Sequence, residues 1–129
     1  MPVVLSMKPP IFIFDSSGDV LAFASPAQAE GHVESVDVED GEYSQAFDSE
    51  GRLLALEVEQ PTGRHKFLGL ESIALTPVRV VEMEAEPGHA EDLRRALLDA
   101  LTRVGHSGGL ASASMGELVE EAFRIFRKR

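Results

Sequence analysis

The sequence contains no cysteine among its 129 residues. This absence excludes disulfide bonds, thiolate nucleophiles, cysteine-ligated zinc and iron–sulfur clusters. The sequence also lacks an apolar run that approaches the roughly 18 residues of a membrane-spanning helix. Its first residues have neither the basic start nor the apolar stretch of a secretory signal. We therefore expect a cytoplasmic protein that binds no membrane.

The motifs of common catalytic and metal sites are missing or misplaced. Residues 105–109 match the Gly-x-Ser-x-Gly nucleophile motif, but they follow an expected helix rather than a strand, and no aspartate or histidine follows them. The histidines form neither His-Glu-x-x-His nor His-x-x-x-His, and there is no phosphate-binding loop ending in Gly-Lys-Ser/Thr. We expect a protein without enzymatic activity that binds no metal and no other cofactor.

Short runs of strand-forming residues dominate the first part of the chain, and helical patterns dominate the last part. Strands are expected at 11–14, 20–24, 42–47, 52–59 and 78–85, and helices at 26–34, 87–104 and from 115 onward. Residues 64–77 are ambiguous between a loop and a loop that leads into a strand at 72–75. Strands followed by helices favour the α+β class. We expect an antiparallel sheet of four to five strands with helices packed on one face.

The end of the chain carries a separate amphipathic helix. Residues 105–114 are rich in Gly, Ser and Ala, which predicts a flexible link. Ser114 and Glu117 form a capping-box pattern at the start of the helix, and Glu120 and Arg124 are spaced for an ion pair on its solvent side. We therefore divide the chain into an α+β core domain (1–104), a flexible link (105–114) and a C-terminal helix (115–129).

This helix has an apolar stripe that needs a partner surface. The stripe consists of Met115, Leu118, Val119, Ala122, Phe123 and Phe126. Because an exposed stripe of this size is a liability, it must dock on the same domain or on a neighbouring copy. The stripe is therefore our candidate for an oligomer interface, and a homodimer stays open as an alternative.

Negative charge is concentrated in one segment. The formal net charge is −10, and residues 30–59 hold ten acidic residues and one base, Arg52. The acids are Glu30, Glu34, Asp37, Glu39, Asp40, Glu42, Asp48, Glu50, Glu57 and Glu59. Nucleic-acid binding depends on Lys and Arg, so a segment with this charge argues against a nucleic-acid partner.

The acids are densest at residues 37–43, Asp-Val-Glu-Asp-Gly-Glu-Tyr, which end in the only tyrosine of the chain. Close carboxylates can serve acid–base catalysis, but catalysis also needs a pocket and a positioned partner group. A tyrosine beside an acidic patch offers rigid contact area with a polar tip, as binding hot spots do. We predict a partner-binding surface formed by Asp37, Glu39, Asp40, Glu42 and Tyr43. A solvated acidic loop without a partner is the alternative.

Residues 37–43, followed by Phe-Asp-Ser-Glu-Gly-Arg-Leu-Leu at 47–54, resemble small acidic bacterial proteins that act as immunity partners of secreted polymorphic toxins. The opening hairpin and the helix that starts near Ser25, with Ala29 and Glu30, look similar too, so the resemblance covers residues 11–101. It is a pattern of turns and alternation rather than a set of chemical residues. It implies a cytoplasmic inhibitor without catalytic residues, which binds and blocks a basic toxin domain.

Two further hypotheses come from other features of the sequence. The stripe of the C-terminal helix fits a self-associating structural or regulatory domain. A small-ligand-binding protein or a small enzyme would require an enclosed cavity lined by convergent polar groups.

Overall fold

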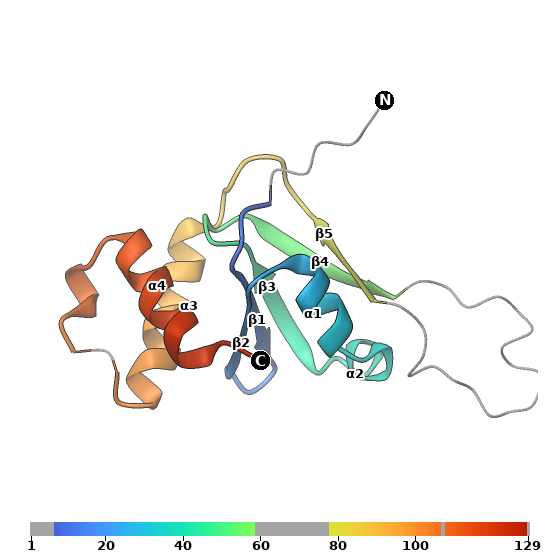
Figure 1. The fold of residues 1–129 in the computed structure, drawn as a ribbon, viewed down its shortest axis with the longest axis horizontal. Helices are drawn as coiled ribbons and strands as arrows, with labels where there is room; N and C mark the ends of the chain where they lie inside the picture. The colour runs from blue at the N-terminus through green and yellow to red at the C-terminus, as the bar shows by residue number, and fades with distance from the viewer. Residues whose placement is uncertain (1–6, 59–77, 107, 129) are drawn as a thin grey trace, which may run out of the picture.

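The computed structural model describes residues 7–58, 78–106 and 108–128 (Figure 1). Within them the chain forms one antiparallel sheet with the strand order β2-β1-β3-β4-β5. The strands are β1 (Ile11–Asp15), β2 (Val20–Phe23), β3 (Tyr43–Phe47), β4 (Leu53–Val58) and β5 (Val78–Glu82). The α+β class and the antiparallel sheet are confirmed. The ambiguous region 64–77 lies outside the described residues.

Four α-helices accompany the strands in the described part of the chain. They are α1 (Pro26–His32), α2 (Ser35–Glu39), α3 (Ala90–Arg103) and α4 (Met115–Phe126), and a short 3-10 helix, η3 (Leu110–Ser112), precedes α4. Ser25 caps α1 by accepting a hydrogen bond from the Gln28 backbone N–H at 3.1 Å. Ser114 and Glu117 form the predicted capping box at the start of α4.

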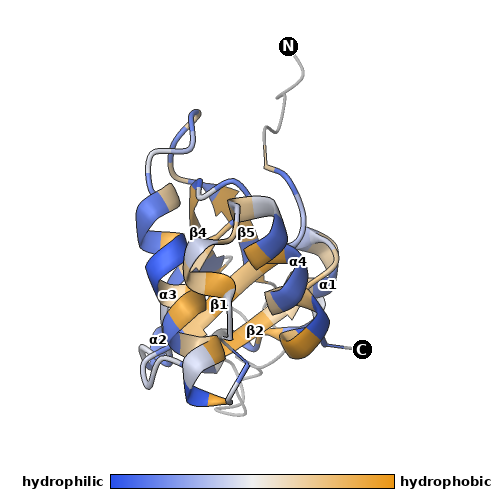
Figure 2. Cartoon of the chain, turned by 90° about the vertical axis from the view of Figure 1, so that its left-hand side faces the viewer, coloured by the Kyte–Doolittle hydropathy of each residue, from blue (hydrophilic) through white to orange (hydrophobic). Residues whose placement is uncertain are grey.

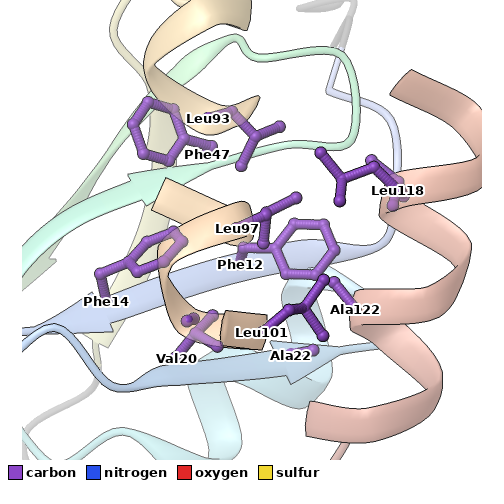
Figure 3. Close-up of a cluster of buried hydrophobic side chains, with 12 residues drawn as sticks. Phe12, Phe14, Val20, Ala22, Phe47, Leu93, Leu97, Leu101, Leu118 and Ala122 are labelled. Carbon is purple, nitrogen blue, oxygen red and sulfur yellow. The ribbon is translucent and has the colours of Figure 1, made fainter. Parts of the chain in front are cut away.

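The strand β1 is buried on both faces because it lies inside the sheet. Phe12 and Phe14 point into a core formed with α3 and α4, whereas Ile11 and Ile13 point into a second core that includes residues of α1. Figure 3 shows the first core, in which the side chains of α3 and α4 meet those of the sheet. The molecule therefore has three layers: two helices, the sheet, and two more helices.

This arrangement corrects the expectation that helices pack on one face only. Figure 1 shows α3 and α4 on one side of the sheet and α1 and α2 on the other. The physical reason is the apolar run Ile11–Phe14, whose four side chains are all buried. A strand without polar positions must be covered from both sides. Figure 2 shows mostly hydrophobic strands behind α3 and α4, which carry hydrophilic residues as well.

Both outer strands have part of their free edge covered by the chain itself. On β2, Ala22 forms a parallel bridge with Arg127 and accepts a hydrogen bond from the Lys128 N–H at 2.9 Å. On β5, the Val80 N–H donates to the Glu30 carboxylate at 2.8 Å. Uncovered strand edges invite pairing with other chains, so both contacts protect the molecule against edge-to-edge association.

Three local expectations need correction. Residues 35–39, expected as part of an acidic loop, form α2. Arg124 pairs with Glu121 rather than Glu120, because Glu121 lies within reach of the same guanidinium, at 2.6 Å. Val104, the last residue of the helix expected over 87–104, lies just beyond α3 and is 49% exposed.

Candidate functional site

The acidic segment divides into structural acids and surface acids. Glu30 is structural, since its carboxylate binds the edge of β5. Asp48 is structural too, since it is fully buried and pairs with the buried Arg52. The one base of the segment is therefore used at the β3–β4 turn, where it pairs with Asp48 and also lies 3.5 Å from the half-exposed Glu50 carboxylate. Glu59 lies outside the described residues.

Asp48 organises the turn between β3 and β4. One of its oxygens accepts hydrogen bonds from the backbone N–H groups of Glu50 and Arg52, each at 2.9 Å, and the other accepts from the Lys8 N–H at 3.0 Å. Arg52 also donates from Nε to the Ala85 carbonyl at 3.0 Å. Burial would lower the pKa of Arg52, but the hydrogen bond to Asp48 and the charges of Asp48, Glu50 and Glu82 together raise it. The arrangement satisfies buried charges and offers no free group for chemistry.

Five surface acids gather around α2 and the start of β3. We call this surface the acidic corner; it consists of Glu34, Asp37, Glu39, Asp40 and Glu42, together with Tyr43. The corner contains all five residues of the predicted partner-binding surface. The chain reverses direction here because Gly41 adopts a φ of 76°, while the Glu42 N–H donates to the Asp37 carbonyl at 3.0 Å. Asp37 is half-buried, and the other four acids are exposed.

A β-bulge turns Tyr43 toward α2. Phe14 faces Gln45 and Asp15 faces Tyr43, so Ser44 is an extra residue in β3. Its hydroxyl lies 3.1 Å from the Asp15 carbonyl. An extra residue reverses the alternation of side chains, and Tyr43 therefore leaves the face of the α3 core and packs against the opposite core. No simple sequence pattern reveals such a bulge in advance.

The Tyr43 hydroxyl lies in a negative environment. Partial burial raises its pKa, and the charges of Asp37, Glu42, Glu34 and Asp15 raise it further. The phenol therefore stays protonated at neutral pH and is available as a hydrogen-bond donor. Asp15 is itself held ionised: burial would raise its pKa, but hydrogen bonds from Ser17, Asp19 and Gly18 outweigh burial and lower it.

A cleft opens beside Tyr43, between β3 and β4. In the described part of the chain these strands pair only at Ala46–Leu54 and Phe47–Leu53. The Asp48 N–H donates to the Arg52 carbonyl at 3.0 Å, so these two residues form a hydrogen-bonded pair. Such pairs recur at every second residue, first at Ala46–Leu54, and the next would fall at Ser44–Leu56. That pair is not formed. The resulting cleft has a volume of about 300 Å³ and is lined by Val38, residues 43–46 and residues 54–56.

A second hollow lies on the other face of the sheet, beside α3. It has a volume of about 460 Å³, and its lining includes Phe14, Gln45, Asp99 and Arg103. Arg103 is already engaged, since its guanidinium donates to the Ser17 carbonyl at 2.8 Å. Asp99 and Gln45 are exposed side chains. The hollow is thus an open groove with polar sides rather than an enclosed cavity.

The sequence motifs did not reveal the pair formed by Glu84 and His89. One Glu84 oxygen accepts hydrogen bonds from the Leu53 N–H at 2.9 Å and the Gly88 N–H at 3.0 Å, and it lies 2.8 Å from His89 Nδ1. The bond to His89 is the main reason that the pKa of Glu84 falls to about 2, and the same bond raises the pKa of His89. The pair ties the β5–α3 connection to β4 and to the start of α3.

The apolar stripe of α4 is used within the chain. Leu118, Val119 and Ala122 are buried in the core shared with α3, and Met115, Phe123 and Phe126 pack partly buried against that core. Arg94 of α3 also donates to the carbonyls of Ala111 and Ala113 in the segment before α4. Of the two docking modes left open by the sequence, the structure has the one within the same chain.

The part of the chain that the structure describes holds neither a metal-ion cluster nor a membrane-spanning helix. Within residues 7–58, 78–106 and 108–128, no three His, Asp or Glu side chains are grouped so that they would hold a metal ion. None of the described helices has the length and apolar character required to cross a bilayer.

No protein-family model fits the chain, and neither a curated protein nor a solved structure matches it. What indicates a function is therefore the geometry and charge of the acidic corner.

Proposed function

We propose that the protein is a non-enzymatic acidic binding module of the cytoplasm that binds a basic protein partner through the acidic corner. The observation that carries the proposal is the gathering of five carboxylates around α2 and the start of β3. Three of them, Asp37, Glu42 and Glu34, place negative charge close to the half-buried Tyr43, while the base of the same segment is paired with the buried Asp48. An inhibitor of a basic toxin domain, as the sequence resemblance implies, is the most concrete form of this function.

The physical advantage of such a surface is long-range attraction. Concentrated charge of one sign speeds association with an oppositely charged protein and orients the encounter. Tyr43 adds apolar contact area and a hydroxyl donor at the edge of the charged surface, a combination found in binding hot spots. Exposed Glu39 and Asp40 supply attraction, and the half-buried Tyr43 and Asp37 supply a fixed contact.

The proposal is tested by site-specific crosslinking in the organism that encodes the protein. A photo-crosslinking amino acid replaces Glu39 in the acidic corner or, for comparison, Glu120 on the outer side of α4. A basic protein should be captured from position 39 and not from position 120. Its capture should weaken as salt rises, because exposed charge pairs are screened within about 8–10 Å at physiological ionic strength.

Charge reversal provides the matched control. Asp40→Lys with Glu42→Lys should abolish capture from position 39. Glu86→Lys with Glu120→Lys changes the net charge equally but at exposed sites outside the acidic corner, and it should leave most of the capture intact. Unchanged binding after reversal at Asp40 and Glu42 would refute the acidic-corner proposal.

A second candidate is a small-ligand-binding protein, and the groove of about 460 Å³ beside α3 is the observation that favours it. The volume lies within the roughly 300–1,000 Å³ typical of ligand pockets. The groove has few buried polar groups that would fix a ligand, so we rank this function below protein binding.

A further inference from the structure

We infer that the cleft between β3 and β4 receives a lysine or arginine side chain of the partner, so that one cation is bound inside the acidic corner rather than only attracted to it. This inference rests on the proposed function, because it specifies how the basic partner is recognised. The shape of the cleft suits one long side chain, and the surrounding charge identifies that side chain as a cation.

The cleft offers an apolar wall for the stem of a long side chain. Val38 of α2 lies on one side, and Leu54 and Leu56 of β4 lie on the other. Lysine and arginine bury their methylene groups on such surfaces while the charged head remains in a polar environment. A volume of about 300 Å³ is at the lower end for ligand pockets, which suits a single side chain better than a larger ligand.

The rim of the cleft selects a cation. Tyr43 lines the cleft, and the four carboxylates that raise its pKa are Asp37, Glu42, Glu34 and Asp15. A cation bound near this hydroxyl would gain from all four charges. The tyrosine ring adds a face that attracts ammonium and guanidinium groups. An apolar or acidic side chain would gain nothing from this rim, so charge complementarity identifies the occupant.

The missing hydrogen-bonded pair between β3 and β4 leaves backbone acceptors at the bottom of the cleft. Ser44 and Leu56 stand where the next hydrogen-bonded pair of β3 and β4 would form. In this register the backbone N–H and C=O groups of Ser44 and Leu56 would face each other, so their carbonyls are the candidate acceptors for a cationic head. The outer edges of the sheet are covered in part, at Ala22 and Val80, whereas this gap lies in the interior of the sheet, next to the acidic corner.

The test uses a short acetylated and amidated peptide with one central arginine between threonines and glycines. Binding is followed through the backbone amide signals of the full chain in NMR titrations at millimolar peptide. The signals of Val38, Ser44 and Leu56 should move together and saturate. A peptide with citrulline, the neutral analogue of arginine, should bind at least tenfold more weakly. Equal binding of the two peptides, or no shift at these residues, overturns the inference.

Two cleft variants and one control separate the cleft from the surface charge. Val38→Lys places a cation of the chain itself in the cleft and should block binding of the peptide. Glu39→Gln makes the same change in net charge on the same helix. Because Glu39 is an exposed charge, this control should weaken binding no more than about threefold. Val38→Phe narrows the cleft without any charge change and should also weaken binding tenfold or more. A dispersed amide spectrum of each variant establishes that it is folded.

The outcomes distinguish this inference from the proposed function. If both cleft variants bind as the wild type does, while reversal at Asp40 and Glu42 still abolishes partner capture, the cleft is not the cation site and the acidic corner remains a binding surface. If reversal has no effect on capture, the proposed function fails, and the inference fails with it.

Discussion

Substitution of Gly51 tests how closely the β3–β4 turn packs against the start of α3. Its φ is +87°, and a Cβ at this position would lie 2.3 Å from the Ala90 Cα, so Gly51→Ala must both strain the backbone and push α3 away. We expect a loss of about 2–5 kcal/mol in the free energy of unfolding, since each effect costs roughly 1–3 kcal/mol. Denaturant unfolding measures the loss.

Gly41→Ala is the matched control for this prediction. Gly41 has a similar φ of +76°, but nothing lies within 4 Å of its Cβ position. Its substitution should cost only the conformational part, about 1–2 kcal/mol. Equal losses at the two glycines would show that the contact with Ala90 does not limit stability.

The Glu84–His89 pair predicts a particular dependence of stability on pH. Because the pKa of Glu84 falls from 4.5 to about 2, its contribution is complete above pH 4.5 and is lost as the pH falls toward 2. Because the pKa of His89 is raised above 6.5, its contribution is complete below pH 6.5 and is lost as the pH rises through the raised value. The pair therefore stabilises the fold most between pH 4.5 and 6.5.

His89→Gln should accordingly lower Tm most in that pH window. The difference in Tm between wild type and variant should shrink as the pH rises through the raised pKa of His89, where the wild-type imidazole loses its proton. Thermal unfolding across the pH range measures it, with His106→Gln, an exposed histidine after α3, as the control. A Tm difference that does not vary with pH would contradict the predicted role of the pair.

At the residue scale, the sequence predicts which residues form a surface better than it predicts where their side chains point. The five residues of the predicted surface do lie together, because they are adjacent in the chain. The extra residue at Ser44, which turns Tyr43 toward α2, depends on the register between β1 and β3 and leaves no mark on the local pattern. The buried role of Asp48 is hidden for a similar reason, since its partners include Lys8, which is distant in the chain.

Among the helices, α4 has the most clearly defined start. Ser114 accepts from the Glu117 N–H at 3.2 Å, and the Glu117 carboxylate binds back to Ser114. Ser114→Ala should lower the free energy of unfolding by about 1 kcal/mol, the usual cost of losing an N-cap. Ser112→Ala, two residues earlier and exposed, serves as the control and should change it by less than about 0.5 kcal/mol. A larger effect at Ser112 than at Ser114 would contradict the capping assignment.

The elements with strong periodicity are predicted well, and so are the short β1, β2 and α1, whereas α2 is not. The apolar spacing in α3 and α4 and the alternation in β4 identify these elements, because each buries one face. α2 has only five residues, too few for a periodic pattern, and its acidic residues resemble a loop. The sequence does not predict α1 and α2 on the second face, because the run Ile11–Phe14 indicates a buried strand but not the elements that cover its two sides.

For the molecule as a whole, the covered edge of β2 predicts the effect of removing the last residues. A chain that ends at Phe126 loses the Arg127 bridge and the Lys128 N–H bond to Ala22. We expect it to self-associate through the exposed edge, which light scattering would show as an increase in mass with concentration. Arg127→Ala with Lys128→Ala keeps the backbone bonds and should leave the association state as in the wild type. If the shortened chain does not associate more than this variant, edge protection is not the role of the segment.

The overall architecture follows from counting strands and helices, but the functional surface depends on how distant segments are placed. Acids of the same segment have different uses: Glu30 binds β5, Asp48 pairs with Arg52, and Asp37 places its charge near Tyr43. Composition alone cannot separate these roles. It identifies the segment that carries the charge, and the fold decides which of its carboxylates remain at the surface.

The contact between Ala22 and the Arg127–Lys128 segment has a consequence during synthesis. The hairpin of β1 and β2 leaves the ribosome long before the residues that cover its outer edge have been made. Nascent chains on neighbouring ribosomes would therefore present the same open edge to one another. Production at high translation rates should favour mispaired chains, and slower synthesis should increase the yield of monomer.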